Sequence, residues 1–477
     1  MDNLTVDVAV IGVGTAGLAA YRAAKKQGRH AILIEGGPYG TTCARVGCMP
    51  SKLLIAAADA AQTIRRAPAF GVHPGPLRID GRQVMARVRT ERDRFVGFVL
   101  DGVDKIPVAD RLRGHARFID PRRLQIGDHT TVTAGRIVIA TGSSPSIPEQ
   151  LQHLGKHVVV NDDVFDWDDL PESVAVVGTG VVGLELGQAL HRLGVRVAIF
   201  GRSNRIAQLT DPVVLESATA CFSDELDLRL NTHIVSAQLQ DQQVALHTRS
   251  ADGSERVERF ALILAAAGRS PNVAQLSLEN TGLELDQQGI PTFDPATMQC
   301  GDSAIFIAGD VNLQRPVLHE ANVQGIEAGK NAALYPDPES AADRVRFSIV
   351  FSEPQIAMIG QSYRTLESTG PGTFAIGAVS FQDQGRSRIM LQNHGTLRVY
   401  AEHGSGRLLG AELAGPRAEH LAHLLAWACQ SKMTISDMLA LPFYHPVVEE
   451  GLRTALRDAQ YQLTHASTSD DMSIVGR

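Results

Sequence analysis

Apolar and polar residues are grouped in blocks along the chain. The first 35 residues show one characteristic order of such blocks. Residues 6–11, VDVAVI, form a short apolar run. A glycine-rich turn follows, then an alanine-rich stretch that ends at Gly28, and then a second apolar run at residues 31–35, AILIE. Short apolar runs bounded by glycine are typical of buried strands, and the longer stretch between them has the composition of a helix. The opening residues therefore predict a strand, a helix and a second strand.

The same arrangement occurs again near the middle of the chain. Residues 173–177, SVAVV, precede a glycine turn, a helical stretch that ends at Gly194, and the run VRVAIF at residues 195–200. Strands that alternate with helices predict parallel sheets. We therefore expect an α/β fold with two domains of Rossmann type.

The glycines give both turns a specific chemistry. The spacing G-x-G-x-x-G occurs at Gly12, Gly14 and Gly17 and again at Gly178, Gly180 and Gly183. Such glycines allow a tight turn, a close approach of the backbone to a pyrophosphate, and close packing of helix on strand. The pyrophosphate then lies at the N-terminus of the helix. Two such units predict that the chain binds two dinucleotides.

The residue at the end of each second strand distinguishes the two dinucleotides. Glu35 stands 18 residues after Gly17, where a carboxylate can accept hydrogen bonds from ribose hydroxyls. Gly201 holds the corresponding position of the second unit, and Arg202 and Arg205 follow it. Loss of the carboxylate and gain of guanidinium groups favour a 2′-phosphate. We therefore expect FAD in the first unit and NAD(P) in the second, with a preference for NADP(H); solvated arginines with NAD(H) bound are the alternative.

Composition and charge exclude several classes of function. The 477 residues include 45 lysines and arginines against 52 aspartates and glutamates, a formal net charge of -7. No global field therefore attracts nucleic acid or an anionic membrane. The N-terminus has no basic leader or cleavable apolar segment, and no run approaches the ~20 apolar residues of a membrane span. We expect a cytoplasmic protein with no nucleic-acid or membrane partner.

Two of the five cysteines stand close together in the segment GTTCARVGCMPSK, residues 40–52. A reducing cytosol disfavours a structural disulfide between Cys43 and Cys48, and no cluster of further zinc ligands follows them. On a regular helix their Cα atoms would be about 8.7 Å apart, too far for a disulfide. We therefore expect an irregular turn at a helix start, where Gly47 and Pro50 fit and where a thiolate is favoured. The segment predicts a redox pair and no metal site.

Several segments resemble, in order and spacing, those of one enzyme family. They are TTCARVGCMPSK (41–52), IVIATGSSPSIP (137–148), LILAAAGRSPN (262–272), SAIFIAGDV (303–311), FSEPQIAMIG (351–360) and FYHPVVEEG (443–451). They are similar to the redox-disulfide, crossover, second flavin, dimerisation and His-Pro segments of the class I pyridine nucleotide-disulfide oxidoreductases. This is the group of dihydrolipoamide dehydrogenase and glutathione reductase.

The resemblance implies a catalytic role for four residues. Cys43 is the thiol that exchanges with the substrate, and Cys48 is the thiol that faces the flavin. His445 is the acid-base, and it reaches the disulfide of the partner subunit, so that a homodimer shares its active sites. Glu450 orients the imidazole and favours its charged form.

The resemblance also implies which residues bind the cofactors. Lys52 and Glu185 match a pair beside the flavin N5; a helix-end ion pair without a catalytic role is the alternative. Further FAD positions are Gly12, Gly14, Gly17, Glu35, Thr42, Thr141, Gly142 and Asp310. The NAD(P) positions are Gly178, Gly180, Gly183, Arg202, Arg205 and Gly268.

The same segments predict the limits of the domains. FAD binding is expected from residues 1–150 and 272–340, and NAD(P) binding from residues 151–271. An α+β dimerisation domain is expected at 341–464. The polar end of the chain, 465–477, is expected to be a mobile tail.

Substrate choice depends on weaker signals. MPSK (49–52) and VVGLELG (181–187) resemble dihydrolipoamide dehydrogenase, so we expect a small dithiol or disulfide of the lipoyl type. A lipoyl-bearing multienzyme complex would then be a candidate partner. Thr41, Arg45 and Gly201 depart from that pattern, which keeps open an NADPH-dependent reductase of glutathione or another small disulfide. A nucleotide-sensing flavoprotein dimer is the alternative from another class, and the complete set of catalytic residues argues against it.

Overall fold

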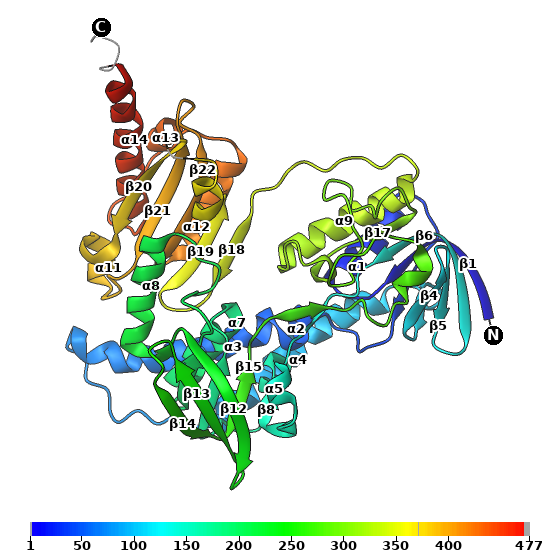
Figure 1. Cartoon of the computed structure of the whole chain (residues 1–477), viewed down its shortest axis with the longest axis horizontal. Helices are drawn as coiled ribbons and strands as arrows, with labels where there is room; N and C mark the ends of the chain where they lie inside the picture. The colour runs from blue at the N-terminus through cyan, green and yellow to red at the C-terminus, as the bar shows by residue number, and fades with distance from the viewer. Residues whose placement is uncertain (1, 371, 472–477) are drawn as a thin grey trace.

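The computed structural model describes residues 2–370 and 372–471. Its first sheet has seven strands built around β1 (Asp2–Ile11), which lies parallel between β2 and β6. The other strands are β2 (Ala31–Glu35), β3 (Arg111–Arg113), β4 (Ala116–Asp120), β5 (Arg123–Ile126), β6 (Thr130–Ile139) and β17 (Ile305–Ile307). β6 pairs antiparallel with β5 along its first half and parallel with β17 along its second half. This sheet forms the right-hand lobe of Figure 1.

Small residues bring two helices together over this sheet. α1 (Thr15–Lys26) is the alanine-rich stretch that follows the first glycine turn, and it packs against α9 (Leu318–Leu334). A Cβ added to Gly325 would lie 2.3 Å from the carbonyl oxygen of Ala16, and one added to Gly329 would lie 2.1 Å from that of Ala20. Only glycine at these positions lets α9 lie directly on α1.

The second sheet has the order β11-β10-β9-β15-β8, with every pair parallel. Its strands are β8 (Val158–Val159), β9 (Ser173–Val177), β10 (Arg196–Phe200), β11 (Asp227–Arg229) and β15 (Leu262–Ala265). An antiparallel meander and two helices accompany it: β12 (Thr232–Gln240), β13 (Gln243–Ser250), β14 (Glu255–Phe260), α7 (Val181–Arg192) and α8 (Pro212–Glu225). β7 (Ser143–Pro145) and β16 (Arg269–Pro271) pair where the chain enters and leaves this unit. The prediction of an α/β fold is confirmed; the second sheet is parallel throughout, whereas the first carries β4 and β5 antiparallel beside its parallel strands.

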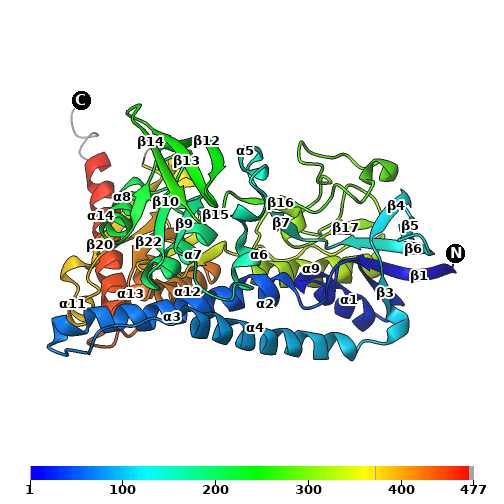
Figure 2. The ribbon, with the colours of Figure 1, turned by 90° about the horizontal axis from the view of Figure 1, so that it is seen from below.

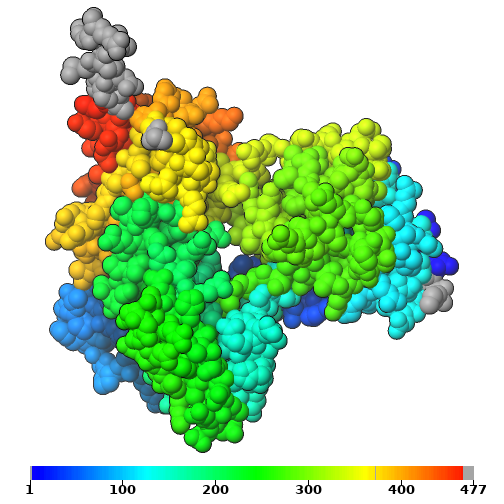
Figure 3. All heavy atoms as spheres, in the orientation of Figure 1, coloured from blue at the N-terminus to red at the C-terminus, as the bar shows by residue number. Residues whose placement is uncertain are grey.

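The third sheet is antiparallel, with the order β18-β19-β22-β21-β20. Its strands are β18 (Phe347–Val350), β19 (Gln355–Gly360), β20 (Phe374–Ser380), β21 (Thr396–Glu402) and β22 (Leu408–Gly415). The helices that accompany it are α10 (Tyr363–Glu367), α11 (Gly385–Ile389), α12 (Ala418–Gln430), α13 (Ile435–Leu439) and α14 (Glu449–Asp471). A recess separates this lobe from that of the first sheet on the face seen in Figure 3.

Helix α14 corrects part of the prediction for the end of the chain. The helix continues to Asp471, so residues 465–471 are helical, and residues 472–477 lie outside the described part. The sequence between Gly451 and Gly476 contains no glycine or proline, so nothing in it stops the helix at residue 464. Polarity alone therefore predicted the wrong local structure here.

Two long helices run beneath all three sheets (Figure 2). α3 (Cys48–Arg66) and α4 (Gly81–Asp104) pack against each other. The arginine-rich face of α4 is paired: Arg92 Nη1 lies 2.5 Å from Asp166 Oδ1, and Arg89 Nη2 lies 3.5 Å from Asp168 Oδ1. These arginines hold the segment that leads into the second sheet. In the described part of the chain, no helix is both long and apolar enough to cross a membrane.

Candidate active site

The two cysteines lie where one helix ends and the next begins. Cys43 is in the short helix α2 (Thr42–Val46), Gly47 is the joint, and Cys48 is the first residue of α3. A Cβ on Gly47 would lie 3.0 Å from the carbonyl oxygen of Thr42, so the turn is tight enough to favour glycine. The helix break places the two thiols close enough to change each other's acidity. The structure therefore contains the irregular turn at a helix start that the spacing predicts.

The two thiols differ in acidity. The hydrogen bond from the Cys43 thiol, supported by the charge of Lys52, outweighs burial and lowers the pKa of Cys48 to about 7. The same hydrogen bond, followed by burial, raises the pKa of Cys43 far above its usual range. Cys48 is therefore the thiol that loses its proton first, and Cys43 donates to the resulting thiolate.

A partly buried ion pair lies one helical turn beyond Cys48. Lys52 Nζ is 2.7 Å from Glu185 Oε2, and the Glu185 side chain is 4% exposed. The amide of Phe351 donates to the other carboxylate oxygen of Glu185 at 2.9 Å, and the Phe351 ring centre is 4.5 Å from Lys52 Nζ. Three segments far apart in sequence thus position the ammonium group beside the redox pair.

Thr41, which precedes this pair, has a backbone conformation that is normally restricted to glycine. Its φ is 59 and its ψ is 149, in a region that costs a residue with a Cβ about 1 to 3 kcal/mol. Its hydroxyl accepts a hydrogen bond from the amide of Ala44 at 3.3 Å and so caps α2. The cap offsets part of the strain, which is stored two residues from Cys43.

Thr41→Gly is expected to stabilise the protein by about 1 kcal/mol. The backbone strain of about 1 to 3 kcal/mol disappears, whereas losing a capping hydroxyl to glycine costs a few tenths and the freer unfolded chain about 0.5 to 1 kcal/mol. The free energy of unfolding in urea measures the effect. Thr41→Ala is the matched control, because it removes the hydroxyl and keeps the strain, so it should destabilise. A less stable glycine variant would contradict this explanation.

Part of the Arg45 side chain is packed against neighbouring residues. A Cβ on Gly40 would lie 2.9 Å from Arg45 Cδ and 3.0 Å from Cγ1 of Val96, so the stem of Arg45 lies in the contact between α2 and α4. Arg45 also lowers the pKa of Asp162, a carboxyl whose pKa burial raises overall. Two of the departures from the family pattern, Thr41 and Arg45, thus both act on how α2 is held.

The His445 and Glu450 side chains form a second part of the site. His445 Nδ1 lies 3.0 Å and 3.1 Å from the two carboxylate oxygens of Glu450, which also accepts from the Val447 amide. The hydrogen bond with His445 lowers the pKa of Glu450. With Nδ1 held in this way, Nε2 is the nitrogen that can transfer a proton. The His445 side chain is 80% exposed.

These two parts lie apart within one chain. No hydrogen bond among the described residues joins His445 to Cys43 or Cys48. α14, which begins at Glu449, and α2, which carries Cys43, lie in different lobes in both views (Figures 1 and 2). The structure of a single chain therefore brings Cys43, Cys48, Lys52 and Glu185 together and leaves the histidine elsewhere.

The first glycine turn fits a pyrophosphate. A Cβ on Gly12 would lie 2.3 Å from the carbonyl oxygen of Ala140, and one on Gly17 would lie 1.9 Å from that of Gly12. Both positions therefore exclude larger residues. A Cβ on Gly14 would meet no heavy atom of the described chain within 4 Å, so the start of α1 is open to a ligand. This combination is what a bound dinucleotide needs.

Two carboxylates flank this turn. Glu35, at the end of β2, accepts from the amides of Val13 at 2.8 Å and Gly37 at 2.7 Å. Asp310 follows β17, and burial raises its pKa against the effect of Arg269. Each oxygen of a carboxylate has two acceptor positions, so both groups can also accept from ligand hydroxyls.

The other predicted FAD positions surround these groups. Thr141 and Gly142 follow β6, where Thr141 Oγ1 donates to the carbonyl of Asn272 at 2.8 Å and Gly142 has a φ of 68. Thr42 is the exposed first residue of α2. Arg269, which sequence reasoning did not single out, donates to Ser143 Oγ at 2.8 Å and so ties the crossover to the Asp310 region. Its position after Gly268 was the available signal.

The second glycine turn repeats the geometry of the first. A Cβ on Gly178 would lie 2.2 Å from the carbonyl oxygen of Ala266, and one on Gly183 would lie 2.0 Å from that of Gly178. A Cβ built on Gly180 or on Gly268 would have no heavy atom of the described residues within 4 Å. The backbone at both glycines is therefore accessible to a ligand. The two glycine turns therefore present the same cradle to a ligand.

Gly201 occupies a closed position next to two exposed arginines. A Cβ there would lie 2.9 Å from Thr179 Cγ2 and 3.0 Å from Leu230 Cδ2, so a carboxylate cannot replace glycine without movement of its neighbours. Arg202 and Arg205 are exposed, and neither guanidinium forms an ion pair with a described residue. Their charges are thus available to a ligand.

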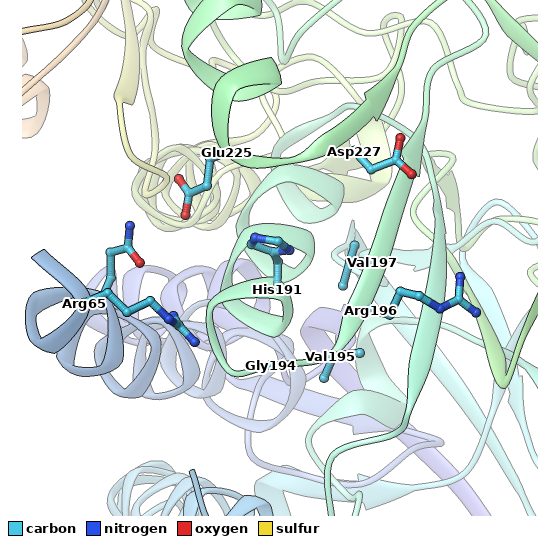
Figure 4. A pocket seen from close by; sticks show the side chains of 9 residues that line it. Arg65, His191, Gly194, Val195, Arg196, Val197, Glu225 and Asp227 are labelled. Atoms are coloured by element: carbon cyan, nitrogen blue, oxygen red, sulfur yellow. The ribbon is translucent and has the colours of Figure 1, made fainter. Parts of the chain in front are cut away.

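A surface hollow lies away from these residues. Figure 4 shows it at the C-terminal end of α7, with a volume of about 520 Å³. It is lined by Gln62, Arg65, His191, Gly194, Val195, Arg196, Val197, Glu225 and Asp227. It contains no predicted site residue, since the glycine turn is at the opposite end of the same helix. Among the described residues, no group of three or more His, Cys, Asp or Glu side chains is placed to hold a metal ion.

Comparison with known proteins identifies the same family that the sequence motifs resemble. The family described as pyridine nucleotide-disulphide oxidoreductase matches residues 6–332, and its dimerisation domain matches residues 347–456. A mercuric reductase of Shigella flexneri is 32% identical over 468 residues, covering 94% of this chain and 80% of its own. A dihydrolipoyl dehydrogenase of Haloferax volcanii is 29% identical (96% and 97% covered), and a mycothione reductase of Mycobacterium tuberculosis is 30% identical (95% and 99% covered).

A solved structure supports the fold. LpdA from Mycobacterium tuberculosis superposes with a TM-score of 0.81 at 24% identity, covering 95% of this chain and 99% of its own. At that identity the similarity establishes the architecture, while chemistry has to be argued from the residues.

Proposed function

The chain belongs to the pyridine nucleotide-disulphide oxidoreductase family, and from this premise we propose that Cys43 and Cys48 are its working dithiol. Members of the family are flavoprotein enzymes that use FAD and NAD(P). The observation that carries the proposal is the position of Cys43 and Cys48 on either side of the helix break at Gly47, one turn before the Lys52–Glu185 pair; in this position the pKa of Cys48 is lowered to about 7 by Cys43 and Lys52. A structural thiol has no need of a neighbour that stabilises its thiolate.

Each residue of the site then has a step to perform. In the oxidising direction, a substrate thiolate attacks the Cys43 sulfur of the Cys43–Cys48 disulfide, which breaks the S–S bond and releases Cys48 as a thiolate. A second substrate thiol attacks the mixed disulfide, so the substrate leaves as a disulfide and Cys43 leaves as a thiol. His445 of the partner subunit takes the substrate protons and returns one to Cys43, while Glu450 orients the imidazole. FAD would be held by the residues around the first glycine turn and NAD(P) by those around the second, and together they would supply the chemistry that takes up the electron pair of the reduced dithiol.

We propose a dihydrolipoyl group as the first candidate substrate, with a homodimer as the working form. The dimerisation domain of the family, matched at residues 347–456, supports the dimer. The three relatives carry names with three different substrates, so their similarity does not choose among them. The test is a panel of lipoamide, glutathione disulfide and related small disulfides, each assayed in both directions with NAD(H) and NADP(H). Turnover of lipoamide that is no faster than that of glutathione disulfide would contradict the first candidate.

The surroundings of Gly201 favour a second candidate, an NADPH-dependent reductase of a small disulfide. Arg202→Ala is expected to lower the ratio of NADPH to NADH efficiency about 10- to 100-fold, since a charge-assisted hydrogen bond to a phosphate contributes roughly 1.5 to 3 kcal/mol. Rates of flavin reduction by each nucleotide measure the ratio. Arg249→Ala is the matched control, because Arg249 pairs with Glu255 at 2.7 Å in the meander of the same domain. An unchanged ratio in Arg202→Ala would remove this residue from nucleotide selection.

The domain limits follow from the same proposal. We assign FAD binding to residues 1–150 and 272–340, NAD(P) binding to 151–271, and dimerisation to 341–464. The pairing of β17 with β6 and of β16 with β7 supports a nucleotide-binding unit inserted within the first domain.

A further inference from the structure

Helices α3 and α7 are joined at two levels. The first level is the pair of Lys52 and Glu185, and the second joins Asp59 Oδ1 to Arg192 Nη1 at 3.0 Å. Both steps, from Lys52 to Asp59 and from Glu185 to Arg192, span seven residues, or about 10.5 Å along a helix. The two helices therefore run side by side in the same direction, and Arg192, at the end of α7, repeats two turns further on the contact made beside Cys48.

The second level is a buried charge cluster. Arg192 is 2% exposed, and its Nε lies 2.6 Å from Glu225 Oε1 of α8. Its Nη2 lies 2.8 Å from Glu353 Oε2, in the connection between β18 and β19 of the third sheet. Arg66 of α3 also pairs with Glu353. One guanidinium thus holds three carboxylates that come from three different parts of the fold.

The segment of residues 351–353 contacts both levels. Glu353 is anchored by Arg192 and by a reciprocal pair of hydrogen bonds with Gln188, whose Oε1 and Nε2 each lie 2.7 Å from the Glu353 backbone. Two residues earlier, the Phe351 amide donates to Glu185 Oε1 at 2.9 Å, and the Phe351 ring lies under Lys52. A continuous path of direct contacts therefore runs from Arg192 to the ion pair beside the redox cysteines.

We propose that Arg192 is a positioning residue for the Lys52–Glu185 pair and that it acts through the segment 351–353. The inference rests on the proposed function of Cys43 and Cys48. Without the guanidinium, the largely buried carboxylates of Glu225 and Glu353 and the exposed carboxylate of Asp59 repel one another. Glu353 is the one that belongs to a connecting segment and can move. Its displacement draws the Phe351 amide away from Glu185.

The expected consequence reaches Cys48. A Glu185 carboxylate that loses the Phe351 hydrogen bond interacts more strongly with Lys52, so less of the ammonium charge is available to the thiolate. Lys52 lowers the pKa of Cys48 and Glu185 raises it. Loss of Arg192 is therefore expected to make the Cys48 thiolate harder to form.

The test is a pH titration of the long-wavelength absorbance that a Cys48 thiolate produces against the flavin in the two-electron-reduced holoenzyme. Arg192→Met is expected to raise the midpoint by about half a pH unit or more. Arg192→Lys should restore part of the difference, because it keeps a positive charge. Arg196→Met is the matched control: Arg196 is four residues further on, donates to the Arg259 carbonyl and lies over the Phe260 ring, without contact to residues 351–353.

Glu353→Gln keeps the proposal testable if Arg192→Met does not fold. It preserves the shape of the side chain, weakens the anchor, and should raise the midpoint in the same direction. An unchanged midpoint in a folded Arg192→Met or Glu353→Gln variant, or an equal shift in Arg196→Met, would overturn the proposal. Failure of the proposed function would show differently, as absence of disulfide turnover in the unsubstituted enzyme, because the titration itself requires no substrate.

Discussion

Cys48→Ser is expected to lower the rate of disulfide turnover roughly 1,000-fold or more, because a hydroxyl cannot form or release a disulfide and loss of a nucleophile removes most of an enzyme's rate enhancement. The same variant should lose the long-wavelength absorbance of the reduced enzyme. In the unsubstituted enzyme that absorbance should fall with decreasing pH around a midpoint near 7, since the pKa of Cys48 is lowered to about 7 and protonation removes the thiolate. Steady-state assays and a spectrophotometric pH titration measure both effects.

Two further variants separate the roles of the cysteines. Cys43→Ala should also abolish turnover yet keep the absorbance, with its midpoint moved to higher pH, because the Cys43 thiol is the largest cause of the acidity of Cys48. Cys221→Ser is the control for loss of a thiol, since Cys221 is a half-buried cysteine of α8. Turnover retained in Cys48→Ser, or lost equally in Cys221→Ser, would refute the assignment of the redox pair.

His445→Gln is expected to slow turnover about 100- to 1,000-fold, the usual contribution of a general acid-base. Glu450→Gln should cost less, because the amide can still hold Nδ1 although it no longer favours the charged imidazole. Flavin reduction by the nicotinamide should be nearly unchanged in both variants, since it does not need His445. Stopped-flow measurement of the two half-reactions distinguishes the steps, and equal slowing of both halves would argue against an acid-base role.

Mixed dimers test where the histidine acts. A dimer of one Cys43→Ala subunit and one His445→Gln subunit has one complete site if the histidine serves the partner subunit, and none if it serves its own. Random mixing of equal amounts yields such dimers as half of the population, so about a quarter of the full activity is expected. Activity no higher than that of the separate variants would place His445 and Cys43 in the same chain's site.

The parts of the fold that sequence predicted best are those built from local signals. Gly12 and Gly17 could be placed because a residue with a Cβ has no room where the strand, the turn and the helix meet. The break between α2 and α3 could be placed because two cysteines five residues apart cannot meet on a regular helix. Resemblance then supplied Lys52 and Glu185 as a pair, although 133 residues separate them.

Contacts that depend on the assembled fold could not be predicted in this way. Phe351 beneath Lys52 and Glu353 against Arg192 join the β18–β19 connection to α3 and α7, and nothing in the residues near them along the chain indicates the contact. The backbone conformation of Thr41 could not be predicted either, because the sequence shows only that a threonine stands where the family usually has glycine. The helical state of residues 465–471 was mispredicted for the opposite reason, since local polarity was given more weight than the absence of a helix stop.

The position of β17 in the first sheet has a consequence for synthesis on the ribosome. Residues 305–307 complete the pairing of residues 137–139, and Asp310 follows at once. At roughly 5 to 20 residues per second, translation needs on the order of ten seconds to pass from one strand to the other. The inserted unit, residues 158–265, is contiguous and can fold during this interval. The nascent chain therefore completes its second dinucleotide-binding sheet before its first, and flavin loading must await emergence of β17 from the exit tunnel.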